Sequence, residues 1–184
     1  TNGGRAIANS TAYGNRNGYA ASDAVAMADH GLAISNSAAD ARGRMGGAAI
    51  ATSESLAGAV NGVAISNSRA DARGSFGGTA HSQSYSTALG RWGYANSDSH
   101  AISRGFLGGR AVSRSDSLSD TYGGISRSRV VSDSRAGYHA SATADGVGIS
   151  VSNPYRRSDV NVRSFSQSTL FGTGNSRAVG VEVR

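Results

Sequence analysis

Small and larger residues alternate along most of the chain. After Gly31 every second residue is Ala, Ser or Gly, from Ala33 through Ser35 to Gly43, while the residues between them are larger or charged. A period of two is that of a β-strand, whose side chains point to opposite faces in turn. The same spacing excludes an α-helix, because a period of 3.6 would scatter the small residues around the helix. The pattern therefore predicts strands with one face built only of Ala, Ser and Gly.

The alternating segments recur with a fixed 31-residue period. The run 31–43 returns almost letter for letter at 62–74. Two families of segments follow this period, and their starting glycines are Gly31, Gly62, Gly93 and Gly124 for the first and Gly47, Gly78 and Gly109 for the second. We therefore expect two strands in every 31-residue unit, which is typical of a stacked repeat architecture.

Turns of a recurring form join the two families. Each turn contains a glycine pair preceded by one large apolar residue. Glycine adopts positive φ values without steric cost, so the pairs are expected to reverse the chain. The turn glycines are Gly46, Gly47, Gly77, Gly78, Gly108 and Gly109. The large residues before them, Met45, Phe76 and Leu107, recur once in every repeat and are expected to stack into a ladder at one corner.

The fold expected from this pattern is all-β, a thin two-sheet β-solenoid with a 31-residue coil and two strands per rung. The small faces are expected to meet inside, because the Arg, Asp and Asn side chains of the other faces are costly to bury. Serine hydroxyls buried in such an Ala/Ser/Gly core need hydrogen-bond partners, either one another or carbonyls. The predicted core ladder consists of Ala33, Ser35, Ser37, Ala64, Ser66, Ser68, Ala95, Ser97 and Ser99.

An antiparallel β-meander, stacked as in silk, is the alternative, since an up strand and a down strand also give the same period. A parallel coil would stack four arginines at strand spacing: Arg42, Arg73, Arg104 and Arg135. They would repel one another unless nearby carboxylates screen them, namely Asp40, Asp71 and Asp133, whereas a meander would space them twice as far apart. We favour the coil.

The composition indicates an unusual core. The chain has 26 Gly but only 4 Phe, 1 Trp and 2 Met, so few large apolar groups offset the entropy lost on ordering it. Disorder is the alternative for a chain rich in Gly and Ser, but the single Pro and the sustained alternation favour an ordered structure. The register breaks after Gly137, which predicts a β-repeat region at 1–136 and a C-terminal capping or subunit-joining β segment at 137–184.

Nothing in the sequence indicates catalysis, a cofactor or a metal site. The chain has no Cys, and its four histidines, His30, His81, His100 and His139, share no metal-ligand spacing. No Gly-x-Ser-x-Gly motif lies on a strand-to-helix turn, and no apolar run approaches the roughly 20 residues of a membrane span. The net charge of +6 is carried by arginines, but these alternate with Asp and do not form a track for phosphates. We therefore expect neither an enzyme nor a nucleic-acid-binding protein.

The pattern Gly-Φ-Ala-Ile-Ser-x-Ser-x-Ala-x-Ala-x-Gly at 31–43, in which Φ is apolar, resembles two groups of secreted proteins. Fibroin-like silks share the alternation of Gly, Ala and Ser, and the heads of trimeric autotransporter adhesins share short Ala-Ile/Ser/Ala-Gly repeats that coil as β-rolls. The resemblance covers roughly residues 4–136 and implies an extracellular assembly that carries mechanical load.

The function expected from these features is that of an extracellular structural subunit, secreted or at the cell surface, which self-assembles into a β-rich fibre or matrix. Its expected partner is the same chain, with a cell surface or a glycan as a second candidate. The alternatives are an adhesin or phage-fibre shaft, and an ice-binding solenoid.

Overall fold

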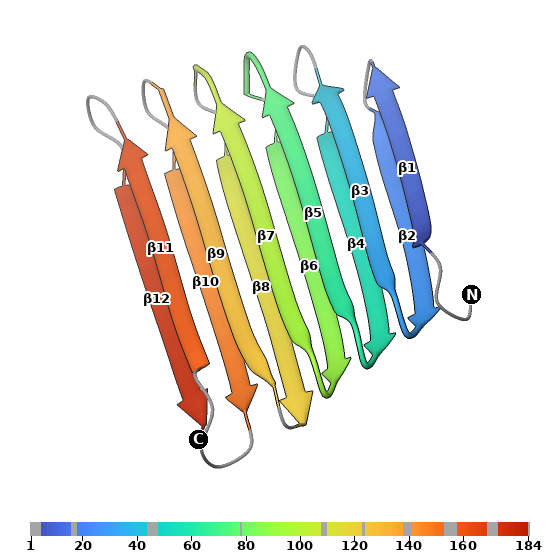
Figure 1. The fold of residues 1–184 in the computed structure, drawn as a ribbon. Helices are drawn as coiled ribbons and strands as arrows, with labels where there is room; N and C mark the ends of the chain where they lie inside the picture. The colour runs from blue at the N-terminus through green and yellow to red at the C-terminus, as the bar shows by residue number, and fades with distance from the viewer. Residues whose placement is uncertain are drawn as a thin grey trace.

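Twelve strands form two parallel six-stranded sheets in the computed structural model. It describes residues 5–15, 18–43, 48–77, 79–107, 110–122, 124–137, 141–152, 158–168 and 173–183, without the side chains of residues 168 and 183. The odd sheet contains β1 (Arg5–Asn15), β3 (Leu32–Gly43), β5 (Val63–Gly74), β7 (Tyr94–Gly105), β9 (Ile125–Ala136) and β11 (Ser158–Ser168). The even sheet contains β2 (Tyr19–Asp29), β4 (Ala48–Val60), β6 (Thr79–Arg91), β8 (Arg110–Tyr122), β10 (Ser141–Ser152) and β12 (Thr173–Val183). Figure 1 shows the sheets one behind the other, with the two ends of the chain at opposite ends of the stack.

Each strand pairs in parallel with the strand two places further along the chain. Leu32 of β3, for example, pairs with Val63 of β5, the equivalent residue of the next repeat. Neighbours in a sheet are therefore separated by one full coil, as parallel pairing requires. This confirms the two-sheet solenoid with two strands per coil and excludes the antiparallel meander. We call the six coils rungs, from the first rung (β1 and β2) to the sixth (β11 and β12).

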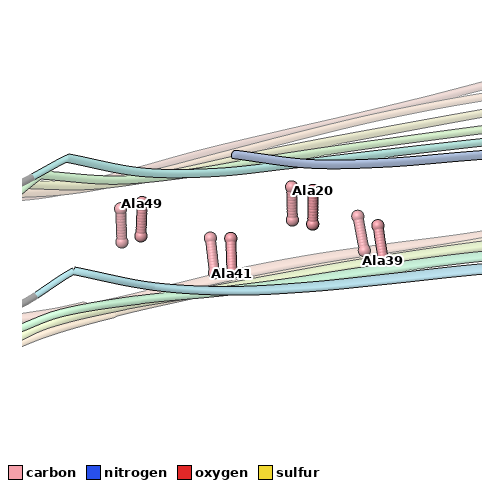
Figure 2. Close-up of a cluster of buried hydrophobic side chains, with 8 residues drawn as sticks. Ala20, Ala39, Ala41 and Ala49 are labelled. Carbon is pink, nitrogen blue, oxygen red and sulfur yellow. The ribbon is translucent and has the colours of Figure 1, made fainter. Parts of the chain in front are cut away.

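The small faces of the two sheets meet in the interior. Burial alternates along β3, where every second residue from Ala33 to Gly43 is buried and the residues between are partly exposed. In Figure 2, Ala20 and Ala49 of the even sheet point toward Ala39 and Ala41 of the odd sheet. Each buried methyl group contributes only about 0.8 kcal/mol, so the stability of this Ser-rich core builds up over many rungs.

The last rungs carry larger inner residues, and glycines on the facing strands make room for them. Val130 of β9 is fully buried. A Cβ placed on Gly146 of β10 would lie 3.2 Å from Val130 Cγ1, and one placed on Gly148 would lie 2.7 Å from Val162 Cγ2. Volume added to the odd sheet is thus removed from the even sheet, which preserves close packing.

The segment after Gly137 extends both sheets. β10 pairs with β8 at the regular offset of one repeat, with Ser141 opposite Arg110. β11 and β12 pair at an offset that is one residue longer, with Ser158 opposite Ser126 and Thr173 opposite Ser141. The 31-residue register therefore continues through β10, beyond the break predicted after Gly137, and one extra residue between β10 and β11 accounts for both longer offsets, while the sheet order continues unchanged.

Backbone hydrogen bonds also link successive rungs at the corners. Gly77 N–H donates to the Leu107 carbonyl at 2.7 Å, and Asn61 N–H donates to the Arg91 carbonyl at 2.7 Å. The sequence predicted that glycines supply the positive φ values. Gly77 does so (φ 77), but the large residues of the corner ladder share this conformation, Phe76 with φ 53 and Leu107 with φ 49. The other members of the predicted turn set, Met45, Gly46, Gly47, Gly78, Gly108 and Gly109, lie outside the described residues.

The opposite corner has its own column of residues with positive φ. His30, Asn61 and Trp92 follow one another at 31-residue intervals, with φ values of 50, 50 and 54. Trp92 also packs edge-on against Tyr122, with ring centroids 5.3 Å apart. Asn61 tolerates this region, but a bulky residue such as Trp92 is strained there, so the bond from Trp92 N–H to the Tyr122 carbonyl of the next rung must hold it in place.

Candidate functional site

A row of serines bridges the gap between the sheets at every half-coil. Ser35 of the odd sheet donates its hydroxyl to the Ala24 carbonyl of the even sheet at 2.6 Å, and Ser55 donates in turn to the Ser35 carbonyl at 2.7 Å. The row continues at 2.7 to 3.0 Å from Ser66 to Ser55, Ser86 to Ser66, Ser97 to Ser86, Ser117 to Ser97 and Ser128 to Ser117. One serine thus spans the gap, so the sheets lie closer than the usual ~10 Å.

A second row of serines runs beside the first. Ser68 donates to the Ser53 carbonyl at 2.5 Å, Ser84 to the Ser68 carbonyl at 2.8 Å, and Ser99 to the Ser84 carbonyl at 2.6 Å. The row ends where Val130 follows Ser99 in the column. We call these two sets the hydroxyl rows.

The nine predicted core-ladder residues occupy three neighbouring columns of the odd sheet, and each is at most 4% exposed. These columns are Ala33, Ala64 and Ala95; Ser35, Ser66 and Ser97; and Ser37, Ser68 and Ser99. The sequence left open whether the serines bond along a column or to carbonyls. In the structure their hydroxyls reach across to carbonyls of the facing sheet, which satisfies their hydrogen-bonding needs in the buried interior.

The two ends of the stack are open sheet edges. Among the described residues, β1 and β2 at one end and β11 and β12 at the other pair with a neighbour on one side only. The backbone groups of such a strand that face away from its neighbour can pair with another chain. Each of these four strands is 11 residues long, so the edges are long enough to form a regular ladder.

Similar side chains lie at both ends of three outer columns of the odd sheet. These end pairs are Asn9 with Asn161, Tyr13 with Phe165, and Asn15 with Gln167. Inside the stack, Asn36 Nδ2 donates to Asn9 Oδ1 and Asn67 Nδ2 donates to Asn36 Oδ1, both at 2.8 Å. Stacked amides of this kind stabilise in-register parallel strands.

Counted over the described residues, the outer faces of the two sheets carry opposite net charge. The odd face has nine arginines and five aspartates, a surplus of four positive charges: Arg5, Arg42, Arg69, Arg73, Arg104, Arg127, Arg129, Arg135 and Arg163, with Asp40, Asp71, Asp98, Asp133 and Asp159. The even face has four arginines and six carboxylates, a surplus of two negative charges: Arg91, Arg110, Arg114 and Arg177, with Asp23, Asp29, Glu54, Asp116, Asp120 and Asp145. The slab therefore has a basic face and an acidic face.

Aspartates screen most of the arginine column on the odd face. Three arginines pair with the aspartate two residues earlier: Arg42 with Asp40 at 3.4 Å, Arg73 with Asp71 at 2.9 Å and Arg135 with Asp133 at 2.9 Å. The hydrogen bond to Asp71 raises the pKa of Arg73. The remaining arginine, Arg104, has Ile102 in the place of the aspartate.

A groove of about 750 Å³ crosses the strands on the odd face. Arg69, Arg129 and Arg163 line it, and none of them forms an ion pair with a described residue. His100 lies in the same groove, where burial, with the charge of Arg69, lowers the pKa of its imidazole. The groove also contains one carboxylate, Asp98, which lies beside Arg129 in the same column, so three arginines and one aspartate leave it with a net positive charge.

The even face carries a corresponding acidic row. Asp23, Glu54, Tyr85 and Asp116 occupy one column across the first four rungs. Burial raises the pKa of Asp116, although Arg114 opposes this by donating from Nε at 3.0 Å. The column ends in Val147 and Val179 in the fifth and sixth rungs.

The three histidines that the structure describes lie apart from one another, at a corner, on the even face and on the odd face. His30 contacts Asp29 at 2.7 Å and Asn61 at 3.0 Å, and burial lowers the pKa of His81. His139 lies outside the described residues. Among the residues that the structure describes, no three His, Asp or Glu side chains are grouped to hold a metal ion, and no helix is long and apolar enough to span a bilayer.

Comparison with known proteins found no matching family model, no matching curated protein and no matching solved structure. The functional interpretation therefore depends on the serine core, the open edges and the charged faces.

Proposed function

We propose that this chain is an extracellular structural subunit that polymerises into a β-rich fibre by stacking its rungs end to end. The observation that carries the proposal is the pair of open edges at the ends of an otherwise continuous parallel stack. A second copy placed below the sixth rung would continue both sheets, because parallel strands pair through backbone groups that every copy provides.

The side chains at the two ends support this stacking. Continuing the columns of the odd sheet into the next copy would place Asn9 against Asn161, Tyr13 against Phe165, and Asn15 against Gln167. The Asn161–Asn9 pair would extend the hydrogen-bonded ladder that already joins Asn9, Asn36 and Asn67, and the Gln167–Asn15 pair would add an amide contact in the arginine column. The aromatic pair would add about 0.5–1.5 kcal/mol beyond its buried area.

One residue at the C-terminal edge opposes uncontrolled stacking. Glu182 of β12 pairs with Ser150 of β10, whose side chain is fully buried, so Glu182 lies in an inner column. A further rung would enclose its carboxylate between the sheets, next to Ala26 of the incoming copy. Inward-pointing charges on edge strands are a known brake on edge-to-edge pairing. Polymerisation would therefore depend on conditions instead of occurring indiscriminately.

The resemblance to silks and adhesin heads agrees with this role, since both are extracellular and built from closely packed small residues. Here the small residues form two hydroxyl rows that tie the sheets together at every half-coil. Such a fibre would resist denaturants, because unfolding one rung breaks backbone ladders on both of its sides.

The experiment is to follow the purified 184-residue chain by electron microscopy and fibre diffraction. We expect filaments with a meridional reflection near 4.8 Å, because the strands would lie across the fibre axis. A chain that stays monomeric at millimolar concentration would refute the proposal. Thermal hysteresis and glycan-array measurements on the same material test the ice-binding and adhesin alternatives.

Cross-linking tests the stacking itself. The chain has no Cys, so Tyr13→Cys and Phe165→Cys can be made separately, mixed and treated with a short bis-maleimide. Both side chains are at least half exposed, and their strands lie five strand spacings apart in one copy, about 24 Å. We expect the mixture to cross-link, whereas Arg5→Cys with Phe165→Cys, in which the partner is at the other end of β1, should not.

A further inference from the structure

The two faces of the slab are complementary in charge, and the complementarity extends to individual rungs. The groove arginines of the odd face lie in the third, fifth and sixth rungs (Arg69, Arg129 and Arg163). The acidic row of the even face lies in the first, second and fourth rungs (Asp23, Glu54 and Asp116). A second copy laid face to face on the first can present its rungs in the same order or in the reverse order.

The same order does not match the charges. It would place Arg69 opposite Tyr85, while Arg129 and Arg163 would face Val147 and Val179. No carboxylate of the acidic row would then meet an arginine of the groove.

The reverse order places a carboxylate of the acidic row opposite each of the three groove arginines, and one of these carboxylates, Asp116, also pairs with Arg114 of its own copy at 3.0 Å. The sixth rung of one copy then lies against the first rung of the next, the fifth against the second, and the third against the fourth. The resulting oppositions are Arg163 with Asp23, Arg129 with Glu54, and Arg69 with Asp116. His100 in the fourth rung falls opposite Tyr85 in the third.

From this match we propose that copies of the chain layer face to face, the odd face of one on the even face of the next, with the order of the rungs reversed. The partner is a second copy of this chain. The proposal builds on the proposed function, because it turns single fibres into a layered matrix. Each copy is related to the one before it by a half-turn about the axis perpendicular to the layers and a shift along that axis. Such a heterologous contact does not close into a ring, so copies can be added without limit.

The faces are large enough for a specific contact. Strands of 11 residues at about 3.3 Å per residue, across five spacings of about 4.8 Å, give a face of roughly 900 Å². A standard interface buries about 800 Å² on each partner. The outer faces carry both polar and apolar side chains and are exposed to solvent. Charge pairing therefore sets the orientation of the layers, and added salt is expected to weaken the contact between them.

Orientation is tested by cross-linking two single-cysteine chains, Asp23→Cys and Arg163→Cys. These positions lie at opposite ends of one copy, about 24 Å apart along the stack, so a short bis-maleimide can join them only between copies. We expect this mixture to cross-link at low salt and to lose most of its product at about 1 M NaCl, where the Debye length falls to about 3 Å. The control mixture, Asp23→Cys with Thr11→Cys, could be joined only if the first rungs of two copies faced each other, so it should give no cross-linked product. More product from this control than from the test mixture overturns the reversed order.

Charge reversal supplies a second test. Arg129→Glu with Arg163→Glu should reduce layered material at least tenfold by sedimentation, because carboxylates then face Glu54 and Asp23. Adding Glu54→Arg and Asp23→Arg to the same chain restores opposite charges and should restore layering, with unchanged circular dichroism as the check on folding. Layering that survives the first variant, or is not recovered in the second, overturns the inference.

The two proposals fail in different ways. Filaments that remain one slab thick at low salt would overturn the layering and leave the fibre proposal standing. If no filaments form, the fibre proposal is lost, and the cross-linking of soluble chains decides the layering by itself.

Discussion

A single methyl group at Gly62 tests how closely the rungs stack. Gly62 lies at a corner, directly beside Gly31 of the preceding rung. A Cβ built on Gly62 would lie 1.9 Å from the Gly31 carbonyl oxygen, whereas real Cβ contacts are not shorter than 3.0 Å. The Gly31 carbonyl cannot easily withdraw, because it accepts the Val63 N–H at 2.9 Å. Gly62→Ala must therefore push the two rungs apart by about 1 Å locally.

The cost of this displacement has two parts. The weakened hydrogen bond to the Gly31 carbonyl accounts for about 1 kcal/mol. Overpacking against backbone atoms adds about 1–3 kcal/mol. We therefore expect Gly62→Ala to lower the free energy of unfolding by about 2–4 kcal/mol, measured by urea denaturation followed by circular dichroism. Gly93→Ala should behave alike, since its Cβ would lie 1.9 Å from the Gly62 carbonyl oxygen.

Gly58→Ala is the matched control. Gly58 lies on the outer face of β4, and a Cβ there would meet only Met27 Cγ, at 3.9 Å. Replacing this glycine should leave the stability unchanged or raise it by up to about 1 kcal/mol, because Gly loses more entropy on folding. If Gly62→Ala stays within about 0.5 kcal/mol of the wild type, as ordinary surface substitutions do, the close stacking of the rungs is refuted.

Three further predictions concern individual side chains. Phe76→Asn should raise the thermal midpoint and stabilise the fold by about 1 kcal/mol, because Phe76 is 60% exposed with φ 53 and Asn tolerates that conformation. An unchanged or lower midpoint would show that Phe76 stores no backbone strain. Because burial lowers the pKa of His81 and His100, the folded state binds fewer protons than the unfolded one, so stability should fall as the pH drops below about 6.5. Replacing both histidines by Asn should flatten that part of the pH profile of the midpoint, and a profile equally steep in the variant would contradict this. Glu182→Gln should lower the critical concentration for filaments at neutral pH at least tenfold, since an ionised carboxylate no longer has to be enclosed, and light scattering would disprove this by showing no change.

The fold could be predicted because one regularity recurs along nearly the whole chain. Period-two alternation fixed the strands, and the repeat from Gly31 to Gly62 fixed which strands are neighbours. The choice between coil and meander was harder, since both give the same period and the coil stacks four arginines that repel one another unless aspartates screen them. The positive φ values at Phe76 and Leu107 could not be foreseen, because propensity assigns them to glycine. Contacts between rungs override that preference.

The serine core and the charged faces could be predicted from the sequence only in part. The sequence suggested that serines such as Ser35 and Ser66 need partners, but bonds along a column and bonds across the gap satisfy them equally. The exchange of volume between Val162 and Gly148 was missed, although valines and glycines enter alternate positions over the same part of the chain. The opposite charges of the faces emerge only once every residue has been assigned to a sheet and a side.

The hydroxyl rows give the stack a chemical direction. In each serine-to-carbonyl bond of these rows the hydroxyl donates toward the N-terminal side, as when Ser97 donates to the Ser86 carbonyl and Ser117 to the Ser97 carbonyl. A fibre made by end-to-end stacking would inherit this direction, and its two tips would differ, with β1 and β2 exposed at one tip and β11 and β12 at the other. New subunits would then join the two tips at unequal speeds, so that each fibre lengthens mainly from one tip.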